Sequence, residues 1–305
     1  MATAPMIVNL ETPAVDLARK TVFIKLHLGL LGNSRKVSSS QVEVDADKRL
    51  IRVSKNLVDS PQLQAIRTLD GDIRRYLYET CLPFEVGIHL LPLGLLETVD
   101  EKLRDFKDQR NKLVEVFLVA YPPLCQEAAG RLRTLYNPAD YPPADEVASR
   151  FNFSWHYVSY GVPEQLREIS ARIFQVERDK AAQAMSEACA EVQQVMRASL
   201  LELVSHLRDR LEDQPDGKPQ RLRESRVQKL RDFLATFDLR NVVDDQELKE
   251  QVERARSLVE GVSTEALRNM PQVRARVREG MAGVAAQMDR LVGDRVGRKF
   301  RFDEE

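Results

Sequence analysis

The chain has 305 residues, of which 43% are hydrophobic and 30% charged, and its formal net charge at pH 7 is -1. This hydrophobic content can fill a sizeable core, which excludes a chain that is disordered throughout. The near-zero net charge excludes a strong overall attraction to nucleic acid or anionic lipid, so such binding would need a local basic patch. Few aromatic residues and few glycines favour a helix-rich protein over a β-sandwich or barrel.

The cysteines and the apolar segments indicate the compartment. Cys81, Cys125 and Cys189 lie far apart and form no CxxC pair, which argues against a disulfide framework or a zinc site and for a reducing environment. Residues 1–20 lack the basic start and unbroken apolar stretch of a signal peptide. The most apolar run, 86–96, is far shorter than the roughly 20 residues of a membrane-spanning helix. We therefore expect a cytoplasmic protein that has no membrane partner.

The first predicted elements are β-strands. Residues 22–30 alternate in a period of two, which is typical of a half-buried strand. After a polar loop at 32–41, the segments 42–44 and 50–53 flank an Asp-Ala-Asp-Lys turn, which predicts a hairpin. We expect the hairpin and the first strand to form one small antiparallel sheet, to which a strand at 151–158 returns.

Two helices are predicted between these strands. Ser60 is a good N-cap, and Pro61 after it suits the first helical position, so a helix should begin there. A short strand at 85–91 follows, and a longer helix should then run from about Leu95 to Tyr121 on a regular spacing of four and three. Two consecutive prolines after Tyr121 are expected to stop this helix, and a short separate helix should follow them.

One charged residue interrupts the apolar stripe of each predicted helix. These residues are Asp70 in the first helix and Arg110 in the second. A charge that faces a core must find a partner, because burying it alone is expensive. Either the two side chains pair with each other, or each reaches the solvent edge of a wide stripe.

A long helix is predicted in the second half of the chain. From Pro163 to about Glu212 there is no glycine or proline, and apolar residues recur at helical spacing. One uninterrupted helix would be on the order of 70 Å long. Because this exceeds the size of a compact domain, the helix should project or pack lengthwise against a partner helix.

Shorter helices should return after a loop at 213–219 that contains proline and glycine. One is predicted around 227–237, and another opens with Asp244 and Glu247, which are spaced as a capping box. The last begins near Pro271 and has an expected basic outer face formed by Arg274, Arg276 and Arg278.

Together these elements predict a predominantly helical α+β protein. A small antiparallel sheet with packed helices would be followed by a long helical hairpin or bundle. The expected domains are an α+β head at 1–162, an elongated helical arm at 163–297 and a charged tail at 298–305.

The sequence contains no recognisable catalytic, metal-binding or nucleotide-binding motif. Its four histidines are not arranged with a nucleophile or with closely spaced metal ligands. No glycine-rich loop ends in the Gly-Lys-Ser/Thr of a phosphate-binding loop. We therefore expect no enzyme activity, no catalytic residue, no metal and no cofactor.

Two basic groups are candidates for nucleic-acid contact. Each has acidic neighbours that weaken its field, so solvated helix faces are the competing interpretation. The candidate residues are Arg74, Arg75, Arg295, Arg298, Lys299 and Arg301.

Small side chains in the long helix indicate a possible protein interface. They let another backbone come close, either from the returning helices of the same chain or from a second protomer. The alternative is that alanine only supplies helix propensity in an exposed segment. The candidate interface residues are Ala181, Ala184, Ala188, Val192 and Val195.

Several short segments resemble a family of uncharacterised proteins from bacteriophages and bacterial mobile elements. They are Val22-Phe23-Ile24-Lys25, Lys55-Asn56-Leu57-Val58-Asp59, Cys81-Leu82-Pro83 and Asp244-Asp245-Gln246-Glu247-Leu248. Members of this family are often encoded near MoxR-type AAA+ ATPases and von Willebrand factor A domain proteins. The resemblance implies a partner in an ATP-driven complex and a bacterial host cell, and it implies no catalytic residues.

The leading hypothesis is a non-enzymatic interaction or assembly protein. It would act through amphipathic helices, and its partner would be itself or an AAA+ ATPase. The alternative is a nucleic-acid-binding accessory protein that uses the local basic patches.

Overall fold

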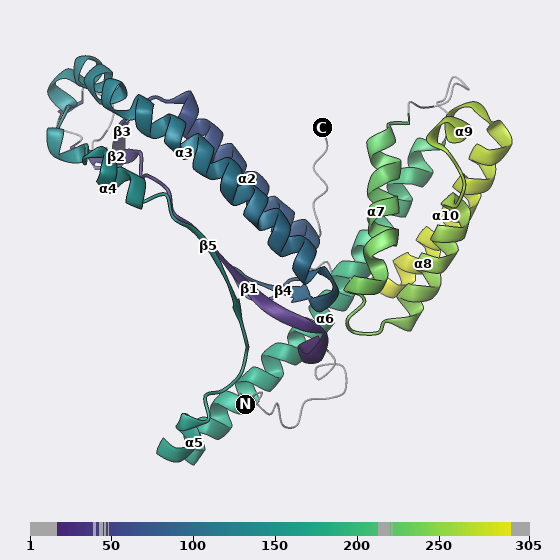
Figure 1. Ribbon diagram of the computed structural model, residues 1–305. Helices are drawn as coiled ribbons and strands as arrows, with labels where there is room; N and C mark the ends of the chain where they lie inside the picture. The colour runs from purple at the N-terminus through teal and green to yellow at the C-terminus, as the bar shows by residue number, and fades with distance from the viewer. Residues whose placement is uncertain are drawn as a thin grey trace. The chain divides into compact units, whose positions relative to one another are not determined.

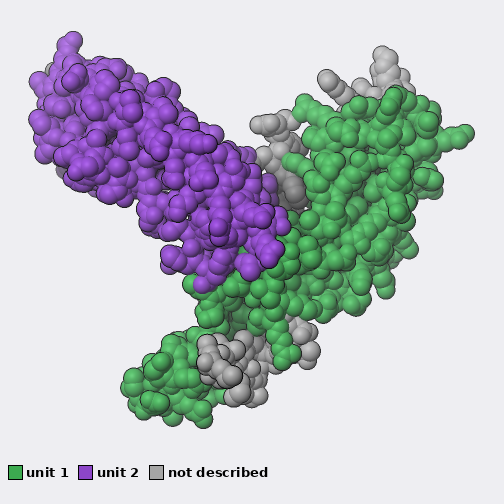
Figure 2. All heavy atoms as spheres, viewed as in Figure 1, with its two compact units in different colours: residues 1–23, 81–95, 158–305 green, residues 24–80, 96–157 purple. Residues whose placement is uncertain are grey.

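The computed structural model describes residues 17–38, 41–42, 45, 47, 49–212, 220 and 222–293. The chain divides into two compact units, which Figure 2 shows in different colours. Unit 1 comprises residues 1–23, 81–95 and 158–305, and unit 2 comprises residues 24–80 and 96–157. The units therefore do not follow the predicted boundary at residue 162. The predicted tail at 298–305 lies outside the described residues.

Unit 2 is built around two long helices, α2 (Pro61–Thr80) and α3 (Leu96–Leu132), which lie side by side (Figure 1). Helix α2 begins as predicted, because the Ser60 hydroxyl accepts a hydrogen bond from the Leu63 amide at 3.1 Å. The smaller helical elements of this unit are η3 (Arg133–Leu135), η4 (Pro138–Asp140) and α4 (Ala144–Ser149).

The charged residues on the two stripes pair with each other inside unit 2. Arg110 is 0% exposed and Asp70 is 2% exposed. Arg110 Nε donates to Asp70 Oδ1 at 2.6 Å, and Arg110 Nη2 lies 3.2 Å from Asp70 Oδ2. The guanidinium also donates to the carbonyls of Phe151 at 3.0 Å and Gly29 at 2.5 Å. The predicted pairing is confirmed, and it fastens both helices to the segments that flank the strands.

Helix α3 continues through both of its prolines, so the predicted stop at Tyr121 is wrong. Tyr121 is buried in the unit 2 core, and its hydroxyl donates to the Pro142 carbonyl at 3.1 Å. Ala128, about two turns further on, is buried in the same core. We attribute the continuation to this packing on both sides of the prolines, which offsets a proline cost of about 3 kcal/mol.

The strands form two small sheets. The first contains β1 (Thr21–Leu28), β4 (Ile88–Pro92) and β5 (Phe153–Val158) in the order β4-β1-β5. The second pairs β2 (Ser34–Val37) with β3 (Val53–Asn56) in antiparallel register, with Ser34 opposite Asn56. The strands predicted at 22–30, 85–91 and 151–158 are thus confirmed within one or two residues at most ends.

The predicted hairpin is wrong in two respects. Its first strand is β2, within the segment predicted to be a polar loop, and it forms a sheet separate from β1. Much of the predicted strand 42–44 lies outside the described residues. The search for alternating apolar residues missed β2 because charged residues help to hold this strand in place. Arg35 of β2 lies opposite Lys55 of β3. Both form ion pairs with Asp140, Arg35 at 3.9 Å and Lys55 at 2.7 Å.

Unit 1 is mainly a bundle of helices. Its core combines apolar residues of five helices with Leu17 and Leu82 from the N-terminal part of the chain. Its helices are η2 (Leu93–Leu95), α5 (Gln165–Ile169), α6 (Ala171–Arg210), α7 (Glu224–Arg240), α8 (Gln246–Val259), α9 (Thr264–Asn269) and α10 (Pro271–Val292).

Helices α6 and α10 run antiparallel along each other. Gln194 donates to the Val292 carbonyl at 2.7 Å near one end, and Arg274 donates to the Leu211 carbonyl at 3.0 Å near the other. Arg274 was predicted on an exposed basic face, and that prediction is wrong because its side chain is buried. Its guanidinium bonds the last carbonyls of α6, which have no partner within that helix.

Two helix starts differ from the sequence prediction. The long helix is interrupted at Ser170, whose backbone is extended and whose hydroxyl accepts from the Ile173 amide at 3.3 Å. A serine favours this capping conformation over a helical one. The N-cap of α8 is Asp245, which accepts from the Leu248 amide at 3.1 Å, whereas Asp244 takes a positive φ of 52°. The predicted predominantly helical α+β class is confirmed.

Candidate protein-interaction surfaces

The first third of α6 is more exposed than the rest of this helix. Val292, the last residue of α10, lies beside Gln194 of α6, whose side chain donates to the Val292 carbonyl. Among the described residues, none from Gln165 to Ala184 is buried, and the buried part of α6 begins at Met185. The predicted long helix therefore packs lengthwise over its second half and is exposed over its first third.

This uncovered segment displays apolar side chains, which we call the α5–α6 face. It consists of Ile169 at 79% exposure, Ile173 at 41% and Val176 at 42%. The spacing of four and three places the last two on one side of α6, with Ile169 just before its N-cap. Apolar groups of this size gathered on one helix face are typical of a surface that another helix covers.

The predicted alanine interface falls partly within the protein's own core. Ala188, Val192 and Val195 are buried in unit 1. Ala181 and Ala184 are partly exposed and belong to the uncovered third of α6. Only these two of the five candidates are accessible to another protein.

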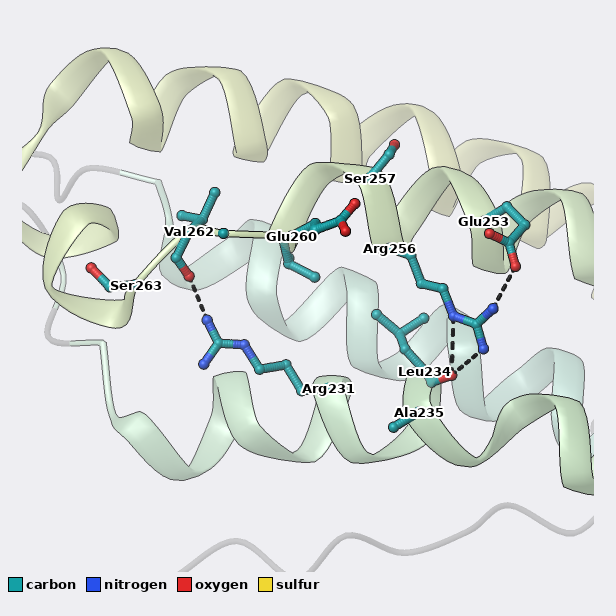
Figure 3. A pocket seen from close by; sticks show the side chains of 11 residues that line it. Arg231, Leu234, Ala235, Glu253, Arg256, Ser257, Glu260, Val262 and Ser263 are labelled. Atoms are coloured by element: carbon teal, nitrogen blue, oxygen red, sulfur yellow. Dashed lines mark hydrogen bonds and ion pairs between the residues drawn. The ribbon is translucent and has the colours of Figure 1, made fainter.

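A second candidate surface is a groove of about 730 Å³ between α7, α8 and the α8–α9 loop (Figure 3). Leu234, Val259 and Val262 give it an apolar base. Its polar lining includes Glu253, Ser257, Glu260 and Ser263, together with Arg231 and Arg256.

The two arginines in the groove connect its walls. Arg256 of α8 donates to the Leu234 carbonyl of α7 at 2.5 Å and pairs with Glu253 at 2.5 Å. Arg231 of α7 donates to the Val262 carbonyl beyond the end of α8. Because these guanidiniums bond backbone carbonyls across the groove, they hold its walls together.

A smaller hollow in unit 2, of about 310 Å³, lies between the end of β3 and the last turns of α3. Three charged residues line it: Arg131 pairs with Asp59 at 3.2 Å and with Glu127 at 2.9 Å. All three side chains are more than half exposed. These pairs contribute little to stability and leave no charge concentrated in the hollow.

The basic residues predicted for nucleic-acid contact are only partly placed by the structure. Arg75 pairs with Asp72, and Arg74 donates to the Asp70 carbonyl at 3.3 Å. Asp72 thus offsets the charge of Arg75, and nucleic-acid contact by Arg74 and Arg75 stays a prediction. The second group, Arg295, Arg298, Lys299 and Arg301, lies outside the described residues.

The cysteine thiols are held in their protonated form by burial. Burial raises the pKa of the Cys81 thiol to about 12, although Arg240 opposes this, and it raises the pKa of Cys189 to about 11. The pKa of Cys125 is also raised, again chiefly by burial. All three cysteines are free. Within the described ranges, no group of three His, Cys, Asp or Glu residues lies close enough to hold a metal ion.

Sequence comparison identifies a family for this chain. Residues 19–224, which are more than half of the chain, match the family described as "Protein of unknown function (DUF3150)". The chain belongs to the DUF3150 family. No curated protein and no solved structure matches it. The DUF3150 match includes all of α5 and α6 and ends at the first residue of α7, so the α5–α6 face is inside the region that defines the family.

The described helices also bear on the membrane prediction. None of them combines the length and the apolar character needed to cross a bilayer.

Proposed function

We propose that this DUF3150 protein is a non-enzymatic interaction or assembly protein that binds a protein partner through the α5–α6 face. The observation that carries the proposal is the exposure, in the part of the chain that the structure describes, of Ile169 at the end of α5 and of Ile173 and Val176 in the first turns of α6. Long amphipathic helices commonly bury such a face in a partner.

The exposed area sets the expected strength of this interaction. The three side chains are 79%, 41% and 42% exposed, and burying those fractions would contribute roughly 2–5 kcal/mol, from about 1.5–3 kcal/mol for a whole side chain. Association also costs translational and rotational freedom. The α5–α6 face therefore supports a reversible contact, or one contact of a larger assembly, rather than a permanent interface by itself.

We further propose that the partner complex contains an AAA+ ATPase in a bacterial host. The resemblance to phage and mobile-element proteins, whose genes often lie near MoxR-type ATPases, supports this assignment. An adaptor in such a complex needs a binding surface and no active site of its own, and the α5–α6 face would supply that surface.

Co-purification tests this function directly. The wild-type chain and an Ile173→Asp/Val176→Asp variant would each be co-expressed with a MoxR-type AAA+ ATPase, and both self-association and ATPase binding would be measured. The double variant should fold normally, because both positions are exposed, and should lose association. Unchanged association of every kind in the double variant would refute the proposed function. A matched control is Ile88→Asp, which replaces a partly buried residue packed on the unit 1 core and should reduce stability instead.

A further inference from the structure

We infer that the α5–α6 face binds a second copy of this chain, with the two α6 helices antiparallel about a two-fold axis near residues 174 and 175. This inference rests on the proposed function and names its partner. The evidence is the pattern of charges beside the apolar stripe, which is complementary to itself.

The stripe on α6 continues past its two exposed apolar residues. Ile173, Val176 and Lys180 recur at three and four residues, so they share one side of the helix. Lys180 Nζ is 2.7 Å from Glu177 Oε1, so its charge is held at the edge of the stripe. Its methylene stem can then cover apolar surface of a neighbouring helix.

Two opposite charges lie along one edge of this stripe. Arg172 and Asp179 are seven residues apart, which places them two turns apart on the same edge. Both are exposed. Among the residues that the structure describes, Arg172 forms no ion pair, and Asp179 accepts only a hydrogen bond from Gln175 at 2.8 Å. Each charge is thus available to a partner.

Antiparallel pairing satisfies both charges at once. When Ile173 of one copy faces Val176 of the other, Arg172 lies opposite Asp179 of the partner copy, and the two-fold axis repeats the contact. Antiparallel helices also oppose their macrodipoles.

Parallel pairing fits these charges less well. It would place Arg172 near Glu177 of the partner copy, but Glu177 already pairs with Lys180 of its own helix. Asp179 would then lack a cationic partner from either copy. The other edge of the stripe carries the partly exposed Ala184, whose small side chain lets a second helix approach closely in either orientation.

The contact should be weak and reversible. About the proposed axis, the two α6 helices overlap over about eight residues each, 171–178, or roughly 12 Å of helix length, which is a small interface. Dissociation constants in the micromolar range are therefore expected. Because the ion pairs are exposed, added salt should weaken the association.

A charge-exchange experiment tests the inference on the full-length chain. Sedimentation velocity over a concentration series would compare wild type, Arg172→Asp, Asp179→Arg and an equimolar mixture of the two variants at low salt. Each variant places two like-charged pairs in its own dimer, so its dissociation constant should rise about tenfold. The mixture should recover association, because both contacts become oppositely charged in the mixed dimer.

A control variant, parallel pairing and a monomeric chain each predict a different result. Arg178→Asp reverses a charge on the opposite side of α6 and should leave association unchanged. If Asp179→Arg associates normally while Arg172→Asp does not, the pairing is parallel and the antiparallel inference fails. If wild type is monomeric at every concentration, yet Ile173→Asp/Val176→Asp abolishes ATPase binding, the second copy is excluded as partner while the proposed function stands.

Discussion

Removing Arg110 should destabilise unit 2 severely, and removing Asp70 as well should restore part of the loss. The Arg110→Met change leaves the 2%-exposed Asp70 carboxylate without its cation, which costs about 3–5 kcal/mol. It also leaves the carbonyls of Gly29 and Phe151 without the donors that now bond them, at about 1–3 kcal/mol each. We therefore expect a loss of at least about 5 kcal/mol, a large part of the stability of a typical domain.

The Asp70→Leu/Arg110→Met double variant removes both charges and retains only the cost of the two carbonyls, about 2–6 kcal/mol. It should accordingly be more stable than Arg110→Met alone. Urea unfolding followed by tryptophan fluorescence measures this, because the only tryptophan of the chain, Trp155, lies in β5 of the same unit. Equal or greater destabilisation in the double variant, or a loss below about 1 kcal/mol in Arg110→Met, would refute the reasoning.

Three further predictions concern single sites. Gly29→Ala should destabilise unit 2, because a Cβ there would lie 2.3 Å from the backbone oxygen of Arg150; the fluorescence assay should show a lower urea midpoint. Ala188→Leu should overpack the unit 1 core and lower its stability by about 1–3 kcal/mol. Ala184→Leu, on the more exposed segment, should leave the stability nearly unchanged. Thermal melting followed by circular dichroism compares the two variants. Cys81 should resist alkylation at pH 8 until the chain is unfolded, because burial raises its pKa to about 12, and mass spectrometry of native and denatured samples tests this.

The sequence predicted the elements that local rules determine. Alternation identified β1, and a serine-proline pair identified the start of α2. The pairing of Asp70 with Arg110 was one of two stated alternatives, because helical periodicity showed that both charges face a core. These features depend on residues close together in sequence or on a stripe that periodicity reveals.

The remaining features depend on contacts between distant segments. The sequence around Pro122 does not show that α3 continues past this proline because Tyr121 and Ala128 pack in the core. The burial of Arg274 follows from the end of α6 lying beside it, some sixty positions earlier in the chain. Among the candidate interface residues, sequence alone could not separate Ala184 from the buried Ala188, because Ala188 is buried in a core that includes residues far away in the sequence, such as Leu17 and Leu82.

Hydrogen exchange on the assembled protein tests the central claim most directly. Peptides covering residues 165–184, none of which is buried within the described chain, would be compared with peptides from α10 in dilute and concentrated samples and with the AAA+ ATPase present. We predict that exchange in 165–184 slows on assembly, while exchange in α10, already packed against α6, stays the same. Unchanged exchange in 165–184 under conditions where the protein is demonstrably assembled would contradict the claim that the α5–α6 face is its interaction surface.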